Sequence, residues 1–408
     1  MTLSHIEGLL VRICSGQPAE VGLQEWPQLY RLACIHEVDP LVVWTLREAW
    51  RDRANDLTDQ LEGIFALNVI AQRLMDAEVI QIHRVFAGVP CLVLKGPALA
   101  SLYFPPGARL QRDIDLLVAD SDYEVARNRL QSIGYRFMDG YSESVQRESA
   151  RDVGFIRDDA SGTQFSVEIH WRLGEPDAVE LDPRRVWDRS RHVVIEGANL
   201  RTPGPEDTLL LLAFNLRKHR FARLKTLVDI DRLIRHEKVD LEMAHAEAHT
   251  LGVCNTLRLA LELCRGVLNS PNPEMPFCGR ADSVRSRLLR RVVDPEAVMA
   301  AGRPEGAYLK VAGLVPFLSL DSWGATAGMA RRRLTLTPEL ASYRAGAPGM
   351  YPNRRRYLAS VAMQVARAAP DVGRRLRSRP EVATSDAEIV NEMQKPLRTV
   401  QSTPNLKP

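Results

Sequence analysis

Residues 112–118 read RDIDLLV, and this short stretch decides the fold class that we expect. Side chains alternate between the two faces of a β-strand, so Asp113 and Asp115 share one face while the apolar residues share the other. Two carboxylates at i and i+2 on a rigid strand offer the hard oxygen ligands that Mg²⁺ or Mn²⁺ prefers. A DxD pair alone is a weak signal, because surface strands and turns often carry one.

A third carboxylate follows in residues 165–171 (FSVEIHW). Aromatic and branched residues alternate there with Ser166, Glu168 and His170, which predicts a strand with Glu168 and His170 on its polar face. If this strand neighbours the first one, Glu168 can face the aspartate pair. Three such carboxylates form a site suited to phosphoryl or nucleotidyl transfer. His170 fits a structural hydrogen-bonding role as well as it fits participation in the site.

The stretch before the aspartates predicts a buried strand at residues 89–94 (VPCLVL) that breaks at Lys95, Gly96 and Pro97. Lys95 has two interpretations. It is either a surface lysine at a strand end or a phosphate ligand, beside a glycine that lets the backbone approach a triphosphate.

The surrounding pattern predicts an α+β chain in which a small α/β core lies between helical regions. Ser4 with Glu7, and Ser121 with Glu124, predict capping boxes at helix starts. Residues 152–157 and 163–171 predict paired strands. The expected divisions are an N-terminal helical region at 1–88, a catalytic core at 89–203, a C-terminal helical domain at 204–377 and a disordered tail at 378–408.

Composition narrows the class of protein. The chain has 408 residues, 45% of them hydrophobic and 26% charged, which is typical of a globular protein. No apolar run reaches a transmembrane length and the N-terminus does not resemble a signal peptide, so we expect a cytoplasmic protein. None of the six cysteines forms a CxxC pair or has a zinc-type spacing, which predicts free thiols.

Residues 280–380 hold 19 Lys and Arg against 7 Asp and Glu, although the whole chain carries only +3. This basic stretch includes the triplet at 354–356 and further arginines at 374–379. Packing against the helical domain is the first interpretation of these arginines. Binding of an anionic acceptor is the second, and contact with a membrane surface is the third.

These motifs resemble the polymerase-β-like nucleotidyltransferase superfamily, whose signature is a glycine-containing turn, a Dh[DE]h strand and a later acidic residue. More narrowly, the chain is similar to the family of uncharacterised nucleotidyltransferases, which bacterial biosynthetic gene clusters usually encode. The matching stretches are 92–96, 109–118, 133–135, 167–171, 218–219 and 224–230.

The resemblance implies a polymerase-β-like core and two-metal transfer of NMP from an NTP, with Mg²⁺ or Mn²⁺ as cofactor. It implies that Asp113, Asp115 and Glu168 bind the metals. It implies that Lys95 and Gly96 face the nucleotide phosphates. We also predict nucleotide binding by Arg109 and by Lys225 and Asp229, which lie on the polar face of a helix after Pro205; a solvated amphipathic helix is the alternative for these last two. Many superfamily members have Ser after the glycine, whereas Pro97 offers neither a hydroxyl nor an amide donor here.

Two alternatives remain open at this stage. A glycosyltransferase could hold a nucleotide-sugar through its DxD motif, although there the hydrophobic strand normally precedes the motif. A nucleotide-binding or partner-binding module could keep the fold without catalysis. The acceptor also stays open among a small molecule such as a sugar phosphate, a peptide or protein, and an RNA 3′ end.

Overall fold

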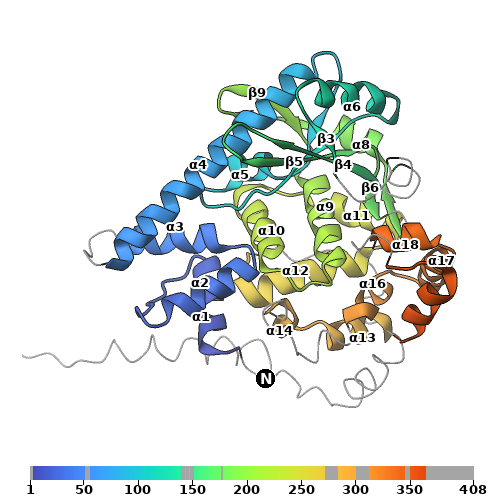
Figure 1. Ribbon diagram of the computed structural model, residues 1–408. Helices are drawn as coiled ribbons and strands as arrows, with labels where there is room; N and C mark the ends of the chain where they lie inside the picture. The colour runs from blue at the N-terminus through green and yellow to red at the C-terminus, as the bar shows by residue number, and fades with distance from the viewer. Residues whose placement is uncertain are drawn as a thin grey trace, which may run out of the picture.

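A five-stranded mixed sheet lies in the upper part of the computed structural model in the view of Figure 1, with helices above it and a larger group of helices below it. The structure describes residues 3–50, 56–138, 143, 147, 151–175, 178–271, 284–299, 312–344 and 350–363. This mixture of helices with small sheets confirms the predicted α+β class.

The N-terminal region is helical, as predicted. Its helices are α1 (His5–Cys14), α2 (Trp26–Ile35), α3 (Asp39–Ala49) and the long α4 (Asp56–Val85). The capping box of α1 is confirmed, because the Ser4 hydroxyl accepts from the Glu7 amide and the Glu7 carboxylate accepts from the Ser4 amide. These contacts satisfy two of the amides that a helix start leaves unpaired.

The central sheet has the order β1-β2-β5-β4-β3. Its strands are β1 (Leu92–Val93), β2 (Ile114–Leu117), β3 (Arg136–Phe137), β4 (Asp152–Asp158) and β5 (Gln164–His170). The pairing of β4 with β5 is antiparallel, as predicted, while β2 and β5 run parallel. Because β2 and β5 are parallel neighbours, their polar side chains meet on one face of the sheet.

Helices α5 (Pro97–Tyr103) and α6 (Tyr123–Ser132) connect the first strands, and Gly134 at φ 93° follows the second helix as the predicted stop. The capping box predicted at Ser121 and Glu124 is wrong. A 3₁₀ turn (Asp120–Asp122) precedes α6, so Ser121 lies inside that turn and no side chain caps the helix.

The chain between the sheet and the C-terminal helices forms two hairpins that the sequence patterns did not predict. They consist of β6 (Leu173–Glu175) with β7 (Val179–Leu181), and β8 (Arg191–Ile195) with β9 (Ala198–Thr202), separated by α8 (Pro183–Asp188). Three-residue strands such as β6 are too short to show a clear periodicity.

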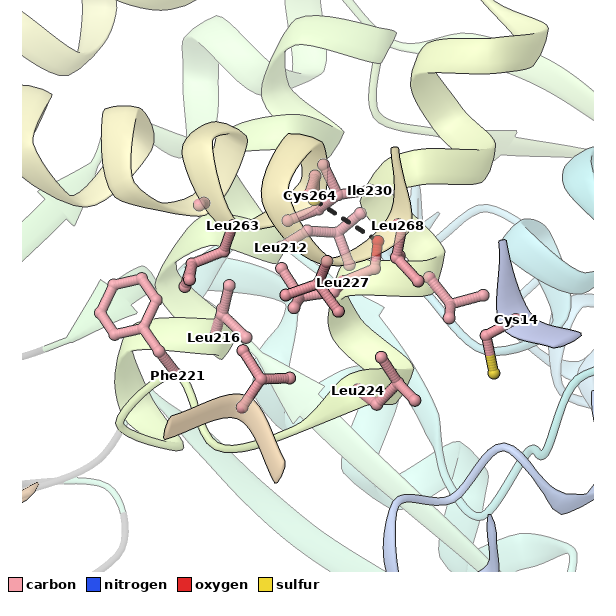
Figure 2. Close-up of a cluster of buried hydrophobic side chains, with 14 of the residues drawn as sticks. Cys14, Leu212, Leu216, Phe221, Leu224, Leu227, Ile230, Leu263, Cys264 and Leu268 are labelled. Atoms are coloured by element: carbon pink, nitrogen blue, oxygen red, sulfur yellow. Dashed lines mark hydrogen bonds between the residues drawn. The ribbon is translucent and has the colours of Figure 1, made fainter. Parts of the chain in front are cut away.

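The helices after Pro205 confirm the predicted helical region. They are α9 (Pro205–Lys218), α10 (Leu224–His236), α11 (Leu241–Leu251) and α12 (Cys254–Leu268). Figure 2 shows apolar side chains of α9, α10 and α12 in one cluster that also includes Cys14 of α1. The N-terminal and C-terminal helices therefore share a hydrophobic core, which also contains Leu117 on the polar face of the sheet.

The opposite face of the sheet has a core of its own. Ile114, Leu116, Val167 and Ile169 pack there with the C-terminal half of α4 and with α6. The predicted alternation of β2 and β5 is therefore confirmed, because their apolar residues share this core. The sheet is covered by apolar side chains on one face and presents its carboxylates on the other.

Further helices are α13 (Val284–Val292), α14 (Pro295–Val298), α16 (Val315–Leu318), α17 (Trp323–Leu334) and α18 (Pro338–Arg344), with a 3₁₀ turn (Ala312–Leu314), and residues 354–363 are helical as well. Arg354, Arg355 and Arg356 are exposed, while the neighbouring Tyr357 is buried and its hydroxyl donates to the Arg333 carbonyl. The arginines at 374–379 and the tail at 378–408 lie outside the described residues.

The five cysteines in the described part of the chain are free, as predicted, and Cys14, Cys91 and Cys264 are buried. Within the same residues, no helix is both long enough and apolar enough to span a membrane. The domain divisions at 88, 203 and 377 stay a prediction.

Candidate active site

Two predicted site residues lie side by side at the centre of the sheet. Asp115 of β2 and Glu168 of β5 are paired in the parallel register. Ligand atoms of Asp115, Glu168 and His170 all lie within 4.8 Å of one another. The structure therefore brings two carboxylates and an imidazole together from adjacent strands, as the alternation of the two strands predicted.

Lys95 joins Asp113 to this group. Its Nζ lies 3.1 Å from Asp115 Oδ2 and 3.5 Å from Asp113 Oδ2. Asp115 is fully buried, whereas the Asp113 side chain is 35% exposed. The two aspartates thus converge on one ammonium group, and Lys95 is part of the site rather than a surface lysine at a strand end.

His170 lies among three carboxylates. Its Nε2 is 3.0 Å from Asp115 Oδ1 and 3.4 Å from Glu168 Oε2, and its Nδ1 is 3.5 Å from Asp152 Oδ2. Burial opposes protonation, but Asp152 and Asp115 outweigh it and raise the pKa of His170 to about 9. The imidazolium of His170 and the ammonium of Lys95 therefore offset the negative charge of the carboxylates around them.

The pKa values of Asp115 and Glu168 are shifted in opposite directions by this environment. Burial opposes ionisation of Asp115, but Lys95 and His170 outweigh it and hold the pKa of this carboxyl below its usual range. Burial raises the pKa of Glu168, and the charges of Asp115 and Asp152 add to this effect. Glu168 is thus the more readily protonated of these two acids.

The Gly96 turn packs directly against the start of β2. Gly96 has φ 61°, and a Cβ at this position would lie 2.9 Å from the Asp113 carbonyl oxygen. A side chain would meet both the left-handed conformation and this close approach. Glycine therefore lets the turn sit against the residue that carries the first carboxylate.

Arg109 and Asp229 form a buried pair beneath this turn. Arg109 Nε and Nη2 donate to the two Asp229 carboxylate oxygens at 2.8 and 2.9 Å, and Arg109 Nη1 donates to the Gly96 carbonyl at 3.2 Å. Both side chains are less than a tenth exposed. The two residues predicted to bind nucleotide thus bind each other and support the turn.

Lys225 of α10 lies at the same end of the site, with its Nζ 3.3 Å from Glu37 Oε2. Burial lowers the pKa of Lys225, the Arg109 charge lowers it further, and Asp229, Glu37 and Asp113 oppose both effects. Lys225 therefore lies within electrostatic reach of Arg109 and Asp113, and its role in nucleotide binding stays a prediction.

Three further charged residues belong to the site but were not among the predicted residues. Asp152 is paired with His170 in the β4–β5 register, Arg151 Nε donates to Asp152 Oδ2 at 3.0 Å, and Lys218 ends α9. Burial lowers the pKa of Lys218, and the Arg151 charge adds to this effect. The alternation of Asp152 and Gly154 with Val153 and Phe155 could have identified Asp152.

A small cavity lies between α9 and the polar face of the sheet. Lys95, Asp115, Arg151 and His170 form its charged wall, and the apolar wall comes from Leu94, Leu173, Leu211, Leu212 and Phe214. The carboxylate site therefore continues into a partly apolar space on the side of Asp115 that faces α9.

Comparison with known protein families assigns the chain. The model of a family described as uncharacterised nucleotidyltransferase matches residues 23–269, which is more than half of the chain. The chain belongs to this family. The match includes β1, the Gly96 turn and both strands that carry the carboxylates, so the resemblance expected from the sequence motifs is confirmed.

Other comparisons add little to the family assignment. No curated protein matches the chain. A solved structure, of an antigenic nucleotidyltransferase-like protein from Paracoccidioides brasiliensis, is similar over 51% of this chain and 92% of that chain, with 15% identity and a TM-score of 0.28. At this level of similarity the match carries no inference about activity.

Proposed function

We propose that this chain is a metal-dependent nucleotidyltransferase that moves NMP from an NTP to an acceptor and releases pyrophosphate. The observation that carries the proposal is the convergence of Asp115 and Glu168 from two adjacent strands, with Asp113, directly before β2, linked to Asp115 through Lys95. Membership of a nucleotidyltransferase family supports the same reaction class.

The donor set suits a magnesium or manganese ion. The three carboxylates offer hard oxygen ligands, which is the chemistry that these cations prefer. The buried Asp115 carboxylate lies 3.1 Å from Lys95 Nζ and 3.0 Å from His170 Nε2, so the site already favours positive charge at this point. Bound divalent ions would lower the pKa of the attacking hydroxyl and stabilise charge on the departing pyrophosphate.

The side chains around the carboxylates have complementary roles in this proposal. Lys95 neutralises charge on the phosphates, and the Gly96 turn brings its backbone close to them. The Arg109–Asp229 pair holds that turn in place, so we assign both residues a positioning role. His170 orients Asp115 and Glu168 through its contacts with their carboxylates.

The test is transfer of label from each α-³²P-labelled NTP with Mg²⁺ or Mn²⁺, in an extract of the cell that encodes the chain. The wild-type chain is expected to label an acceptor and to release pyrophosphate. Asp115→Asn and Glu168→Gln should each lower the rate by roughly a thousandfold.

Glu180→Gln is the matched control, because Glu180 is an exposed acid of β7 that pairs with Arg172 outside the site. Its rate should equal that of the wild type. Turnover of a nucleotide-sugar without NTP turnover would instead support a glycosyltransferase. Binding of NTP without any turnover would support a nucleotide-binding module, and either result would overturn the proposal.

A further inference from the structure

Glu37, in the connection between α2 and α3, is surrounded by cations from separate parts of the chain. Its carboxylate lies 3.3 Å from Lys225 Nζ, 3.4 Å from Arg223 Nη1 and 3.8 Å from Arg112 Nε. Glu37 itself has φ 58°, a left-handed conformation that is unfavourable for a residue with a side chain. The backbone is thus strained at the position that places this carboxylate among the cations.

The contacts of Glu37 are longer than those of the two-pronged arginine–carboxylate pairs near the site and on α10. Arg109–Asp229 and Arg235–Asp231 have two nitrogen–oxygen distances each, all of 2.8 or 2.9 Å. None of the Glu37 contacts is shorter than 3.3 Å. The three cationic groups thus share the two oxygens of one carboxylate at long distances, which leaves N–H donors of the cluster for a further anionic acceptor.

The cluster of Arg112, Arg223 and Lys225 around Glu37 adjoins the Asp113 side of the candidate active site. Arg112 directly precedes Asp113, and Lys225 lies within electrostatic reach of Asp113 and Arg109. Asp39 is a second acid near these cations, and burial raises its pKa. Three cationic side chains from separate parts of the chain therefore gather around the single carboxylate of Glu37.

We propose that Arg112, Arg223 and Lys225 form the subsite for the terminal phosphates of the nucleotide, and that Glu37 occupies this subsite until phosphate displaces it. The inference rests on the proposed function, because it places the polyphosphate beside the Asp113 end of the metal site. A polyphosphate offers more acceptor oxygens and more negative charge than one carboxylate, and arginine forks bind such groups in a bidentate manner.

The experiment measures binding of inorganic tripolyphosphate to the full-length chain by isothermal titration calorimetry. Lys225→Met and Arg223→Gln should each weaken binding by about tenfold. Glu37→Gln keeps the shape of the side chain and removes the competing charge, so it should tighten binding by about tenfold. Glu37→Asp withdraws the carboxylate by one methylene and should tighten binding less.

Glu247→Gln is the control, because Glu247 is also buried between arginines, Arg185 and Arg189, but lies outside the site. Its affinity for tripolyphosphate should equal that of the wild type. Weaker or unchanged binding in both Glu37 variants would overturn the proposal and make Glu37 a structural partner of the cations. Unchanged binding in Lys225→Met and Arg223→Gln would overturn it as well.

The calorimetry tests the phosphate subsite independently of the proposed nucleotidyl transfer. Tripolyphosphate binding requires neither a nucleobase nor catalysis. If the variants change its affinity as expected and no NTP is turned over, the subsite stands as a polyphosphate site and nucleotidyl transfer fails. If the wild type transfers NMP and the variants keep its KM for NTP, the subsite alone is wrong.

Discussion

Loss of Asp229 should destabilise the protein strongly, because it leaves the Arg109 guanidinium buried without its counter-charge. Arg109 and Asp229 are 6% and 4% exposed, and their two hydrogen bonds are 2.8 and 2.9 Å long. Removal of one partner from such a buried pair typically costs about 3–5 kcal/mol. We therefore expect Asp229→Ala to lower the free energy of unfolding by roughly that amount.

The measurement is urea unfolding of the wild type and the variants, followed by circular dichroism and by tryptophan fluorescence. Asp158→Ala is the control, because Asp158 and its partner Arg136 are each about half exposed. That variant should cost less than about 0.5 kcal/mol. A double replacement, Arg109→Met with Asp229→Leu, removes both charges and should cost less than Asp229→Ala alone.

A cost below about 1 kcal/mol for Asp229→Ala would refute this reasoning, since it would mean that Arg109 finds another partner or reaches water. The double variant also tests the positioning role. It removes the hydrogen bond from Arg109 to the Gly96 carbonyl, so it should stay folded but bind NTP more weakly. Unchanged NTP affinity in a folded double variant would show that the turn does not depend on this pair.

Further predictions concern the turn, a buried histidine and the metal. Gly96→Ala should cost at least about 1–2 kcal/mol in urea unfolding and lower the transfer rate, because Cβ would lie 2.9 Å from the Asp113 carbonyl in a left-handed conformation. Burial lowers the pKa of His36 to about 4, and its ring nitrogens have no hydrogen-bond partner among the described residues. The unfolded chain therefore binds a proton at His36 near pH 6.5, whereas the folded chain binds it only near pH 4. The free energy of unfolding should therefore fall as the pH drops from 6.5 to 4, and it should fall less in His36→Leu. EDTA should abolish NMP transfer, and excess Mg²⁺ should restore it; transfer that persists in EDTA would contradict a metal requirement.

Local periodicity was sufficient to predict the strands that carry the site. Asp113, Asp115 and Glu168 each lie in a stretch where apolar and polar residues alternate, and this alternation fixes the face on which each side chain points. The parallel pairing of Asp115 with Glu168 was only a conditional expectation, because 46 residues of chain, 118–163, separate β2 from β5.

Residues that reach the site through tertiary contacts could not be predicted in this way. Glu37 lies in a connection between helices, and nothing in its neighbourhood indicates that it meets Arg223 and Lys225. Arg109 and Asp229 were predicted to bind nucleotide because polar residues in matching stretches suit that role. Their mutual pairing depends on the packing of α10 against the Gly96 turn, which sequence spacing does not encode.

The central claim is that Asp113, Asp115 and Glu168 together hold divalent cations, and Mn²⁺ binding followed by electron paramagnetic resonance tests it most directly. In the presence of a non-hydrolysable NTP analogue, the free Mn²⁺ signal should fall on addition of wild-type protein. It should remain at the protein-free level with Asp115→Asn or Glu168→Gln, while Glu180→Gln should behave as the wild type. Equal Mn²⁺ binding by all four proteins would contradict the account.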